Sequence, residues 1–600
     1  MNLSCRLAAA LVAAAISGCA VKPVSDPSPL AAPSPVQAAD AQASSAHRSA
    51  GAPLASVEGP LPAVDLSPQI LFQILAADMA LQRGEGGAAW NTYSQLARQT
   101  RDPRLARRAT EIALGGRALN EATQSARLWQ ELSPESTQAS QTLETLLLAS
   151  GKLSDVEPML AARLSRARQA GTLAETYPAL QRSLLRSPDR AAAWQMLQRL
   201  SATDLNEPQA RLARLALASA ARDEAAAVSE ARAAIALSPA SESVLIAATR
   251  QIAQSPDGLP EAERVLAEFL EKNPQSVDAR DLYARVLLAD GQADKARSQF
   301  EQALSKSPAN PSLLLALAQL SQQDRRFADA RRYFEQYLAI PSLPRRDRHL
   351  AWIQMAQVAA DEGRPDEAFK WLDQVPEGDE YLSAITKRAQ LMAKSGQLEA
   401  ARAVLQKAPA TSLSDKALMI TAESQLLREA RRNQESFDLL TRGLQEYPDQ
   451  TDLLYDHAMA AERLDRVDDM EKSMRRLIEL RPDHAHAYNA LGYSLADRGL
   501  RLPEARSLIE KALALSPDDA HIMDSMGWVM FRQNDLEGAL KFLRKAYAIR
   551  READIGAHLG EVLWSTGQRD EARAIWRDVK AREPDNTTLQ ETLSRLNVAL

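Results

Sequence analysis

The chain has 600 residues, of which 45% are hydrophobic and 25% are charged, so it can bury a core as an average globular protein does. Only 23 residues are glycine and 5% are aromatic, which disfavours tightly turned all-β folds and favours helices. The formal net charge of −6 is too small to attract a polyanion, and nothing in the composition indicates nucleic-acid binding.

The N-terminus has the features of a secretory signal. The basic residue Arg6 precedes an uncharged apolar stretch from Leu7 to Ile16, and small residues follow up to Cys19. This stretch is too short to span a bilayer, which needs about 20 residues. We therefore expect residues 1–18 to be removed as a signal peptide.

The segment from Ile16 to Cys19 resembles a bacterial lipobox, in which the cysteine becomes the lipidated first residue of the mature chain. The resemblance implies acylation of Cys19, with palmitate among the lipids. Because Ala20 follows and not aspartate, it also implies delivery to the periplasmic face of the outer membrane. The alternative is ordinary cleavage after one of the alanines at positions 13–15, which would leave Cys19 free.

Residues 19–68 differ in composition from the rest of the chain. Nine prolines lie between Ala20 and Pro68, among alanine, serine and valine, and no helical or alternating period is visible. Such a composition cannot offset its ordering entropy by burial. It predicts a disordered Ala/Pro/Ser-rich tether between the lipid and the folded part.

After residue 69 the pattern is helical and its breaks recur. Helix-ending residues follow one another at intervals of 33 to 39: Pro239, Pro274, Pro308, Pro341, Pro376, Pro409, Pro448, Pro482, Pro517, Arg551 and Pro584. A second series, mostly alanine, runs in phase with them: Ala262, Ala296, Ala330, Ala368, Ala401, Ser436, Met470, Ala505, Ala539 and Ala572. Two series in phase indicate repeats. We predict about ten regular repeats in residues 241–600 and degenerate helical pairs in residues 69–240.

The repeat resembles the tetratricopeptide repeat (TPR), which has a period of about 34 residues. One copy reads Tyr488-x-x-Leu491-Gly492-x-x-Leu495, followed by Ala505, Ile509, Ala512 and Pro517. A small residue in the first helix, facing alanine in the second, lets the two helices approach closely. The resemblance implies an all-α TPR solenoid, a right-handed superhelix of helix-turn-helix repeats, in place of the four domains that the length suggests.

No group of residues in the sequence points to catalysis, so we predict that the protein is not an enzyme and holds no cofactor. The sequence has no His-Glu-x-x-His, no Gly-x-Ser-x-Gly and no phosphate-binding loop. His484, His486 and His521 lie near successive helix starts and could bind a metal. Polar residues at helix starts explain them better, and we predict no metal site.

Aromatic and polar residues recur on three successive C-terminal first helices, at positions that face the concave side of a TPR. They are His486, Asn489, Tyr493 and Asp497, then His521, Asp524, Trp528, Phe531 and Arg532, then Glu561 and Trp564. Exposed aromatics among polar groups are typical of peptide-binding hot spots. We predict a partner-binding groove here. The alternative is that the curvature of the array buries these residues against neighbouring helices.

The order of lipobox, Pro-rich tether and long repeat array resembles the outer-membrane TPR lipoproteins. In length and layout the chain is similar to the lipoprotein adaptors of periplasmic C-terminal processing proteases. The resemblance implies a membrane-anchored interaction scaffold that docks such a protease and presents substrates such as cell-wall hydrolases. The alternative is a structural or assembly role in an envelope machine, a type IV pilus or an exopolysaccharide exporter. In both cases the partners are proteins and the membrane, and neither nucleic acid nor a small-molecule substrate is expected.

Overall fold

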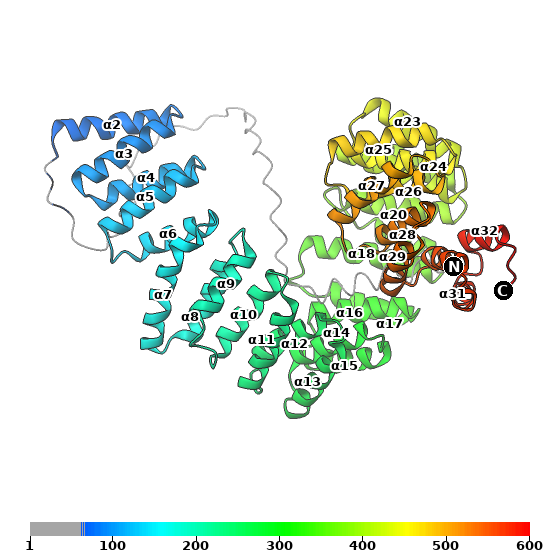
Figure 1. Cartoon of the computed structure of the whole chain (residues 1–600), viewed down its shortest axis with the longest axis horizontal. Coiled ribbons are helices and arrows are strands. Elements are labelled where there is room, and N and C mark those ends of the chain that lie inside the picture. The colour runs from blue at the N-terminus through cyan, green and yellow to red at the C-terminus, as the bar shows by residue number, and fades with distance from the viewer. Residues whose placement is uncertain (1–61, 63, 65) are drawn as a thin grey trace. The chain divides into compact units, whose positions relative to one another are not determined.

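The computed structural model describes residues 62, 64 and 66–600. The predicted signal peptide, Cys19 and nearly all of the predicted tether therefore lie outside the described residues. The described part contains 31 helices and no strand, which confirms the all-α prediction (Figure 1). In the same part of the chain, no helix combines the length and the apolar character that a membrane span requires.

The contacts divide the chain into two units, Met1–Tyr337 and Leu338–Leu600. The helices of unit 1 are α2 (Pro68–Gln82), α3 (Gly86–Thr100), α4 (Pro103–Gly115), α5 (Leu119–Leu132), α6 (Thr137–Ala149), α7 (Leu153–Ala170), α8 (Leu173–Leu184), α9 (Arg190–Leu200), α10 (Pro208–Ala220), α11 (Glu224–Leu237), α12 (Glu242–Gln254), α13 (Leu259–Lys272), α14 (Val277–Ala289), α15 (Ala293–Lys306), α16 (Pro311–Gln323) and α17 (Phe327–Leu338).

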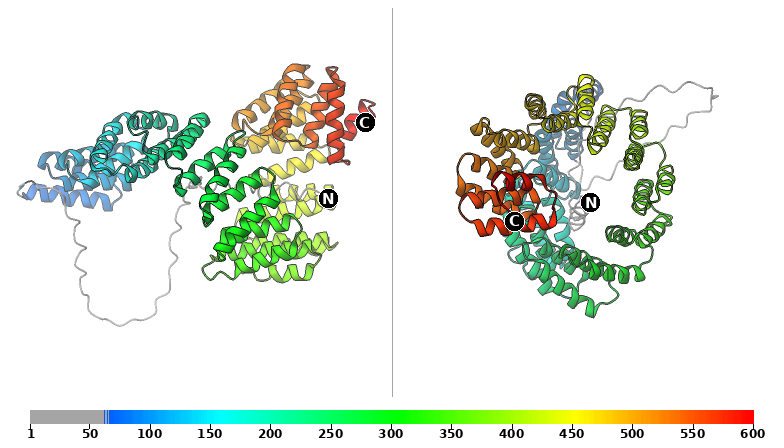
Figure 2. Two further views of the ribbon diagram at one scale, coloured as in Figure 1. Left: turned by 90° about the horizontal axis from the view of Figure 1, so that it is seen from below. Right: turned by 90° about the vertical axis from the view of Figure 1, so that its right-hand side faces the viewer.

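The helices of unit 2 are α18 (Arg345–Asp361), α19 (Pro365–Leu372), α20 (Tyr381–Lys394), α21 (Leu398–Gln406), α22 (Leu413–Glu429), α23 (Asn433–Glu446), α24 (Thr451–Arg463), α25 (Val467–Leu480), α26 (Ala485–Asp497), α27 (Leu502–Leu515), α28 (Ala520–Arg532), α29 (Leu536–Ile549), α30 (Ala553–Ser565), α31 (Arg569–Arg582) and α32 (Thr587–Arg595). Even-numbered helices are the first of each pair. Within each unit, most successive helices lie beside one another in chain order (Figures 1 and 2).

The ends of the second helices confirm the prediction made from the prolines. Helix α27, for example, ends at Leu515, two residues before Pro517, and α31 ends at Arg582, two residues before Pro584. A proline has no amide hydrogen to donate and restricts the residue before it, so the helix stops first. Polar caps then start the next helix: the Asp519 side chain accepts hydrogen bonds from the first amides of α28.

The predicted alanine series lies inside the helix pairs. All ten of its positions fall on second helices and are buried. Gly492 on α26 faces this series closely, because a Cβ atom added there would lie 2.9 Å from the carbonyl oxygen of Ala505. The two helices of a pair therefore touch along a strip of small residues, and larger side chains fill the space between pairs.

Residues 137–200 depart from simple pairing. Helix α8 packs mainly on α10, and α9 packs on α7 and α10. From α12 to α31, by contrast, twenty helices follow one another as ten pairs, with α32 after them. The repeats therefore become regular near residue 240, whereas the two contact units meet at Tyr337 and Leu338.

Candidate functional site

The residues of the predicted groove lie on α26, α28 and α30, which are neighbouring first helices of unit 2. Three of these residues, Asp524, Trp528 and Glu561, are only 2% to 7% exposed. The expectation that they line an open groove is wrong, and the alternative of burial holds for them. The first helices approach one another closely enough for these side chains to bond across the gap between repeats.

His558 on α30 is the centre of this buried contact. Its Nδ1 lies 3.0 Å from Oδ2 of Asp524, and its ring stacks on Trp528 with 4.3 Å between ring centroids. Burial opposes the charged form of the imidazole. The negative charge and hydrogen bond of Asp524, with the charges of Asp554 and Glu561, outweigh burial and raise the pKa of His558. Asp524 and His558 therefore join α28 to α30 as an ion pair.

Similar bonds join other successive first helices. Glu561 on α30 accepts hydrogen bonds from both terminal nitrogens of Arg595 on α32, at 2.6 and 2.7 Å. Arg498, which follows α26, donates to Glu462 on α24 at 2.5 Å. These partners are 34 to 36 residues apart, as in His558 and Asp524. The polar residues of this face thus connect successive repeats. The sequence analysis did not predict these bonds, although the spacing of about 34 residues between the partners indicates them.

The other predicted groove residues keep some exposure. His486 is exposed, whereas Asn489, Tyr493, Phe531, Arg532 and Trp564 are partly exposed. The guanidinium group of Arg569 lies over the Trp564 ring at 5.0 Å, and burial raises the pKa of the Tyr493 hydroxyl well above its usual value. Partner binding by these six residues stays a prediction.

A second surface, which we name the α20 hollow, lies between α18, α20 and α22. It is a cavity of about 250 Å³ whose lining residues include the apolar Ile353 and Leu418. The polar wall residues are Gln354, Gln357, Ser383, Thr386, Lys387 and Gln390. All come from first helices, which the repeat places on one face of the array.

Lys387 is the charged residue of this hollow. Burial, and the nearby charge of Lys394, lower the pKa of its ammonium group. Asp361 attracts the ammonium, and its carboxylate also accepts a hydrogen bond from Gln357 at 2.5 Å. The hollow therefore presents a half-buried cation.

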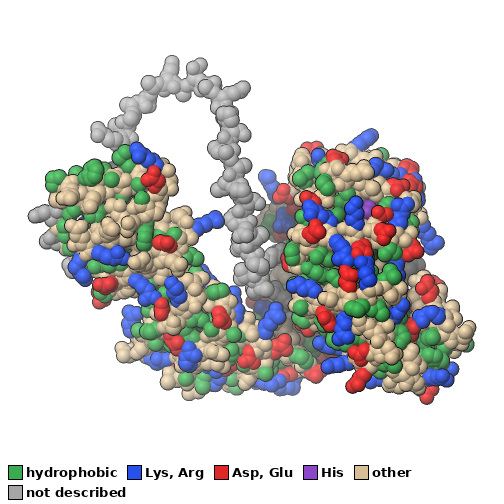
Figure 3. Space-filling model, turned by 45° about the horizontal axis from the view of Figure 1, so that its top comes forward, with side chains coloured by type: hydrophobic (Ala, Val, Ile, Leu, Met, Phe, Trp, Pro, Cys, Tyr) green, Lys and Arg blue, Asp and Glu red, His purple; other side chains and the backbone are tan. Residues whose placement is uncertain are grey.

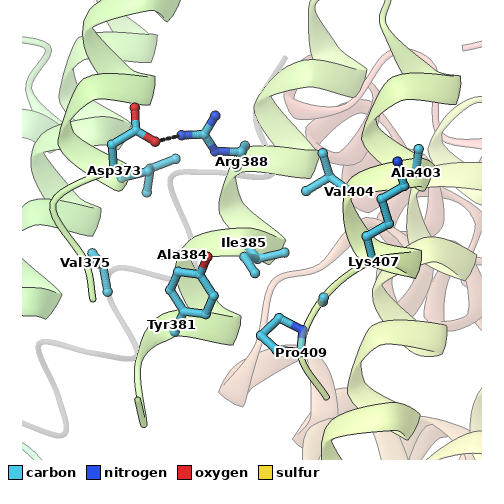
Figure 4. A pocket seen from close by; sticks show the side chains of 12 residues that line it. Asp373, Val375, Tyr381, Ala384, Ile385, Arg388, Ala403, Val404, Lys407 and Pro409 are labelled. Carbon is cyan, nitrogen blue, oxygen red and sulfur yellow. Dashed lines mark hydrogen bonds and ion pairs between the residues drawn. The ribbon is translucent and has the colours of Figure 1, made fainter. Parts of the chain in front are cut away.

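A notch beside α20 results from two short second helices. Helix α19 has 8 residues and α21 has 9, whereas each second helix from α23 to α31 has 14. The missing turns leave a cavity of about 390 Å³. Figure 4 shows Ile385 and Tyr381 facing it from α20, Pro409 on the opposite side, and the ion pair of Asp373 and Arg388 at its edge. It is an apolar recess with a charged rim.

In unit 1, helix α2 has an apolar face that no described residue covers. Leu71, Phe72, Leu75 and Met79 are between 44% and 71% exposed, while the opposite side of the helix packs against α3 and α4. Figure 3 shows hydrophobic side chains at the surface of this end of unit 1. The end helix of a repeat array ordinarily presents a polar outer face, as α32 does at the other end. A patch of this kind marks an interaction surface.

Tetratricopeptide-repeat profiles match residues 259–320, 287–343, 455–520 and 520–553. With the helix pairs described above, they define the class: a helical-repeat solenoid of the tetratricopeptide type. The matched residues are thus identified as tetratricopeptide repeats.

A TPR repeat-containing protein of Pseudomonas aeruginosa is 32% identical over 211 residues, which are 35% of this chain and 36% of that protein. The match thus spans about a third of the relative's length. Among solved structures, MamA of Desulfovibrio magneticus is 20% identical with a TM-score of 0.25, and covers 29% of this chain and 99% of its own. A thermophilic TPR protein of Thermus thermophilus is 23% identical with a TM-score of 0.28, and covers 30% and 100%.

Proposed function

We propose that the protein is a membrane-anchored periplasmic scaffold that docks a processing protease and presents its substrates, such as cell-wall hydrolases. TPR arrays are scaffolds for protein–protein interaction, and the uncovered apolar face of α2 supports such a role here. The face carries four large apolar side chains on one side of a single helix. Burial of such exposed apolar area against a partner protein would stabilise the complex.

The proposed mechanism is tethering. A lipid at Cys19 and the predicted tether of residues 19–68 would hold the repeat array near the membrane surface. Protease and substrate bound to the same array would meet at a high effective concentration, without any change in their own chemistry. The resemblance of the N-terminal sequence to a lipobox and the composition of residues 19–68 support this part of the proposal.

The test is affinity capture of the protein and its crosslinked partners from membranes of cells that produce it. We expect a periplasmic protease and cell-wall hydrolases among the captured proteins. The double variant Phe72→Glu/Leu75→Glu should lose the protease, because two carboxylates cannot be buried in an apolar contact. The matched control is Leu237→Glu/Ile549→Glu, which changes two isolated exposed apolar residues and should capture as the unaltered protein does.

Two results would contradict this proposal. Recovery of pilus or exopolysaccharide-export components in place of a protease would favour the assembly role. If the Phe72→Glu/Leu75→Glu variant and its control captured the protease equally, α2 would not be the docking surface.

A further inference from the structure

Helix α2 can be placed in register with the regular first helices of unit 2. Ala77 on α2 and Ala89 on α3 are both buried and lie 12 residues apart. Gly527 on α28 and Ala539 on α29, the small residues at which that pair of helices touches, have the same spacing. Helix α2 is therefore the first helix of a repeat, and each of its residues has a counterpart on the regular first helices.

The exposed residues of α2 have buried counterparts. In this register Phe72, Leu75 and Met79 correspond to Ile522, Ser525 and Val529 on α28 and to Ile555, His558 and Val562 on α30. The six counterparts are at most 4% exposed, whereas the three α2 residues are between 53% and 71% exposed. The same positions are thus covered inside the array and open on α2.

The preceding pair of helices covers these positions inside the array. Ile555 on α30 shares a buried cluster with Ala546 of α29, and the Phe542 side chain of α29 packs against that cluster. His558 pairs with Asp524 of α28. Among the described residues no helix precedes α2. Its exposed face is therefore the surface on which the second helix of a preceding pair would pack.

Leu71 distinguishes this face from an array end that is merely uncovered. Its counterparts on α28 and α30 are His521 and Asp554, which are polar and exposed. A leucine at a position where the regular repeats are polar adds apolar area beyond what the repeat itself requires. The charged side chain of α2 is Asp78, whose carboxylate accepts a hydrogen bond from Tyr93. The occupant must therefore be apolar where it contacts α2.

The spacing of the exposed residues selects a helix as the occupant. Phe72, Leu75 and Met79 stand at i, i+3 and i+7, the row that one packed helix presents to another. We propose that α2 receives an amphipathic helix of the docked partner, which packs on this row as a second helix packs on the first helix that follows it. This inference rests on the proposed scaffold function and gives its docking partner a structural class.

Photocrosslinking with mapping of the attached residues tests the proposal. A photoreactive phenylalanine analogue replaces Phe72, Leu75 or Met79, one at a time, in the full chain of producing cells, and mass spectrometry identifies the partner residue attached at each position. We expect the three attached residues to lie in one segment of the partner and to be separated by three, four or seven residues, because such residues share a helix face. The control position is Leu237, an isolated exposed residue that should not attach this segment.

A synthetic peptide of the attached segment then measures the contact by calorimetry with the detergent-solubilised full chain. Phe72→Ala should weaken its binding at least about tenfold, whereas the control Leu237→Ala should leave it unchanged. Proline at a solvent-facing position in the middle of the peptide should weaken binding about a hundredfold, because proline disrupts a helix. Thermal unfolding verifies that both variants of the array are folded.

The proposal is overturned if no protein is attached at these positions, if the attached residues are scattered over several segments or alternate as in a strand, or if the proline peptide binds as tightly as the original. Attachment of residues 1–61 of this chain in place of a partner would also overturn it. Capture of a protease whose attached residues have the wrong spacing would retain the scaffold function and remove the helix. Absence of a protease from the captured proteins would instead contradict the scaffold function.

Discussion

His558 and Asp524 lie on successive first helices, 34 residues apart, and are both buried. At the scale of single residues, this pair illustrates what the sequence could and could not predict. The 34-residue period identifies them as neighbours in space. Whether a side chain at such a position meets solvent or the next helix depends on how closely the first helices approach, which no residue of the repeat specifies alone.

The first prediction concerns the pH dependence of stability. Because folding raises the pKa of His558, its ion pair contributes fully below the unfolded-state pKa of about 6.5 and is lost as the pH rises through the folded-state pKa. Asp524→Asn should lower the free energy of unfolding at about pH 6 by roughly 3 kcal/mol, and by less at about pH 9. Urea unfolding at both pH values measures this.

The control for that prediction is Asp518→Asn, which alters an exposed aspartate beside the start of α28. It should change the free energy of unfolding little at either pH value. An equal loss of stability at both pH values in Asp524→Asn would mean that His558 is not charged in the folded protein.

The second prediction concerns the close approach of paired helices. A Cβ atom at Gly527 on α28 would lie 2.6 Å from Cγ of Leu543 and 3.1 Å from the carbonyl oxygen of Ala539. Gly527→Ala should therefore reduce the free energy of unfolding by about 1–3 kcal/mol. Gly87→Ala is the matched control on α3, where a Cβ would meet no described atom within 4 Å, and it should stabilise by about 0.4–1 kcal/mol. Equal stability of the two variants would contradict the packing described here.

At the scale of helices, the prolines predicted where second helices end. Pro376 and Pro409 indicated the ends of α19 and α21, yet both helices are five or six residues shorter than the 14 residues of α23. The notch beside α20 follows from those missing turns. Both helices begin three residues before their alanine, Ala368 or Ala401, as the other second helices do. The turns are therefore missing at their C-terminal ends, because Pro376 and Pro409 follow these alanines by 8 residues, whereas Pro448 follows Ser436 by 12.

The third prediction concerns local stability along the array. Residues 522–530 of α28 are all buried between neighbouring helices. Helix α2 packs against other helices on one side only, and its other face is exposed. In a repeat array, stability comes from contacts with adjacent repeats, so end helices open most readily. Hydrogen exchange followed by mass spectrometry should show slow amides in α28 and α30 and fast amides in α2 and α32. Protection of α2 equal to that of α28 would mean that its apolar face is covered.

At the scale of the whole molecule, composition and period predicted the class of fold, a helical-repeat solenoid, without naming a partner. Tethering and docking were expectations from the N-terminal sequence and from resemblance. The apolar face of α2 and the hollow around Lys387 were not predicted, because exposure and burial are properties of the folded array. A run such as Ile70-Leu71-Phe72 reads equally well as core.

The fourth prediction concerns attachment to the membrane. If a lipid on Cys19 holds the protein at the membrane, Cys19→Ala should release it from the membrane fraction into the periplasmic fraction, because the acyl chains are then missing. Immunoblotting of the two fractions measures this, with the unaltered protein as the control. Retention of Cys19→Ala in the membrane fraction would refute the anchor.

Site-specific photocrosslinking at position 72 of α2 tests the central claim most directly. A photoreactive phenylalanine analogue replaces Phe72, and in a parallel control it replaces the exposed Ile549 at the end of α29. If the array is a scaffold that docks a protein on α2, irradiation of producing cells should attach one protein at position 72 and none at position 549. Attachment of lipid alone at position 72, or of no protein at all, would contradict the account.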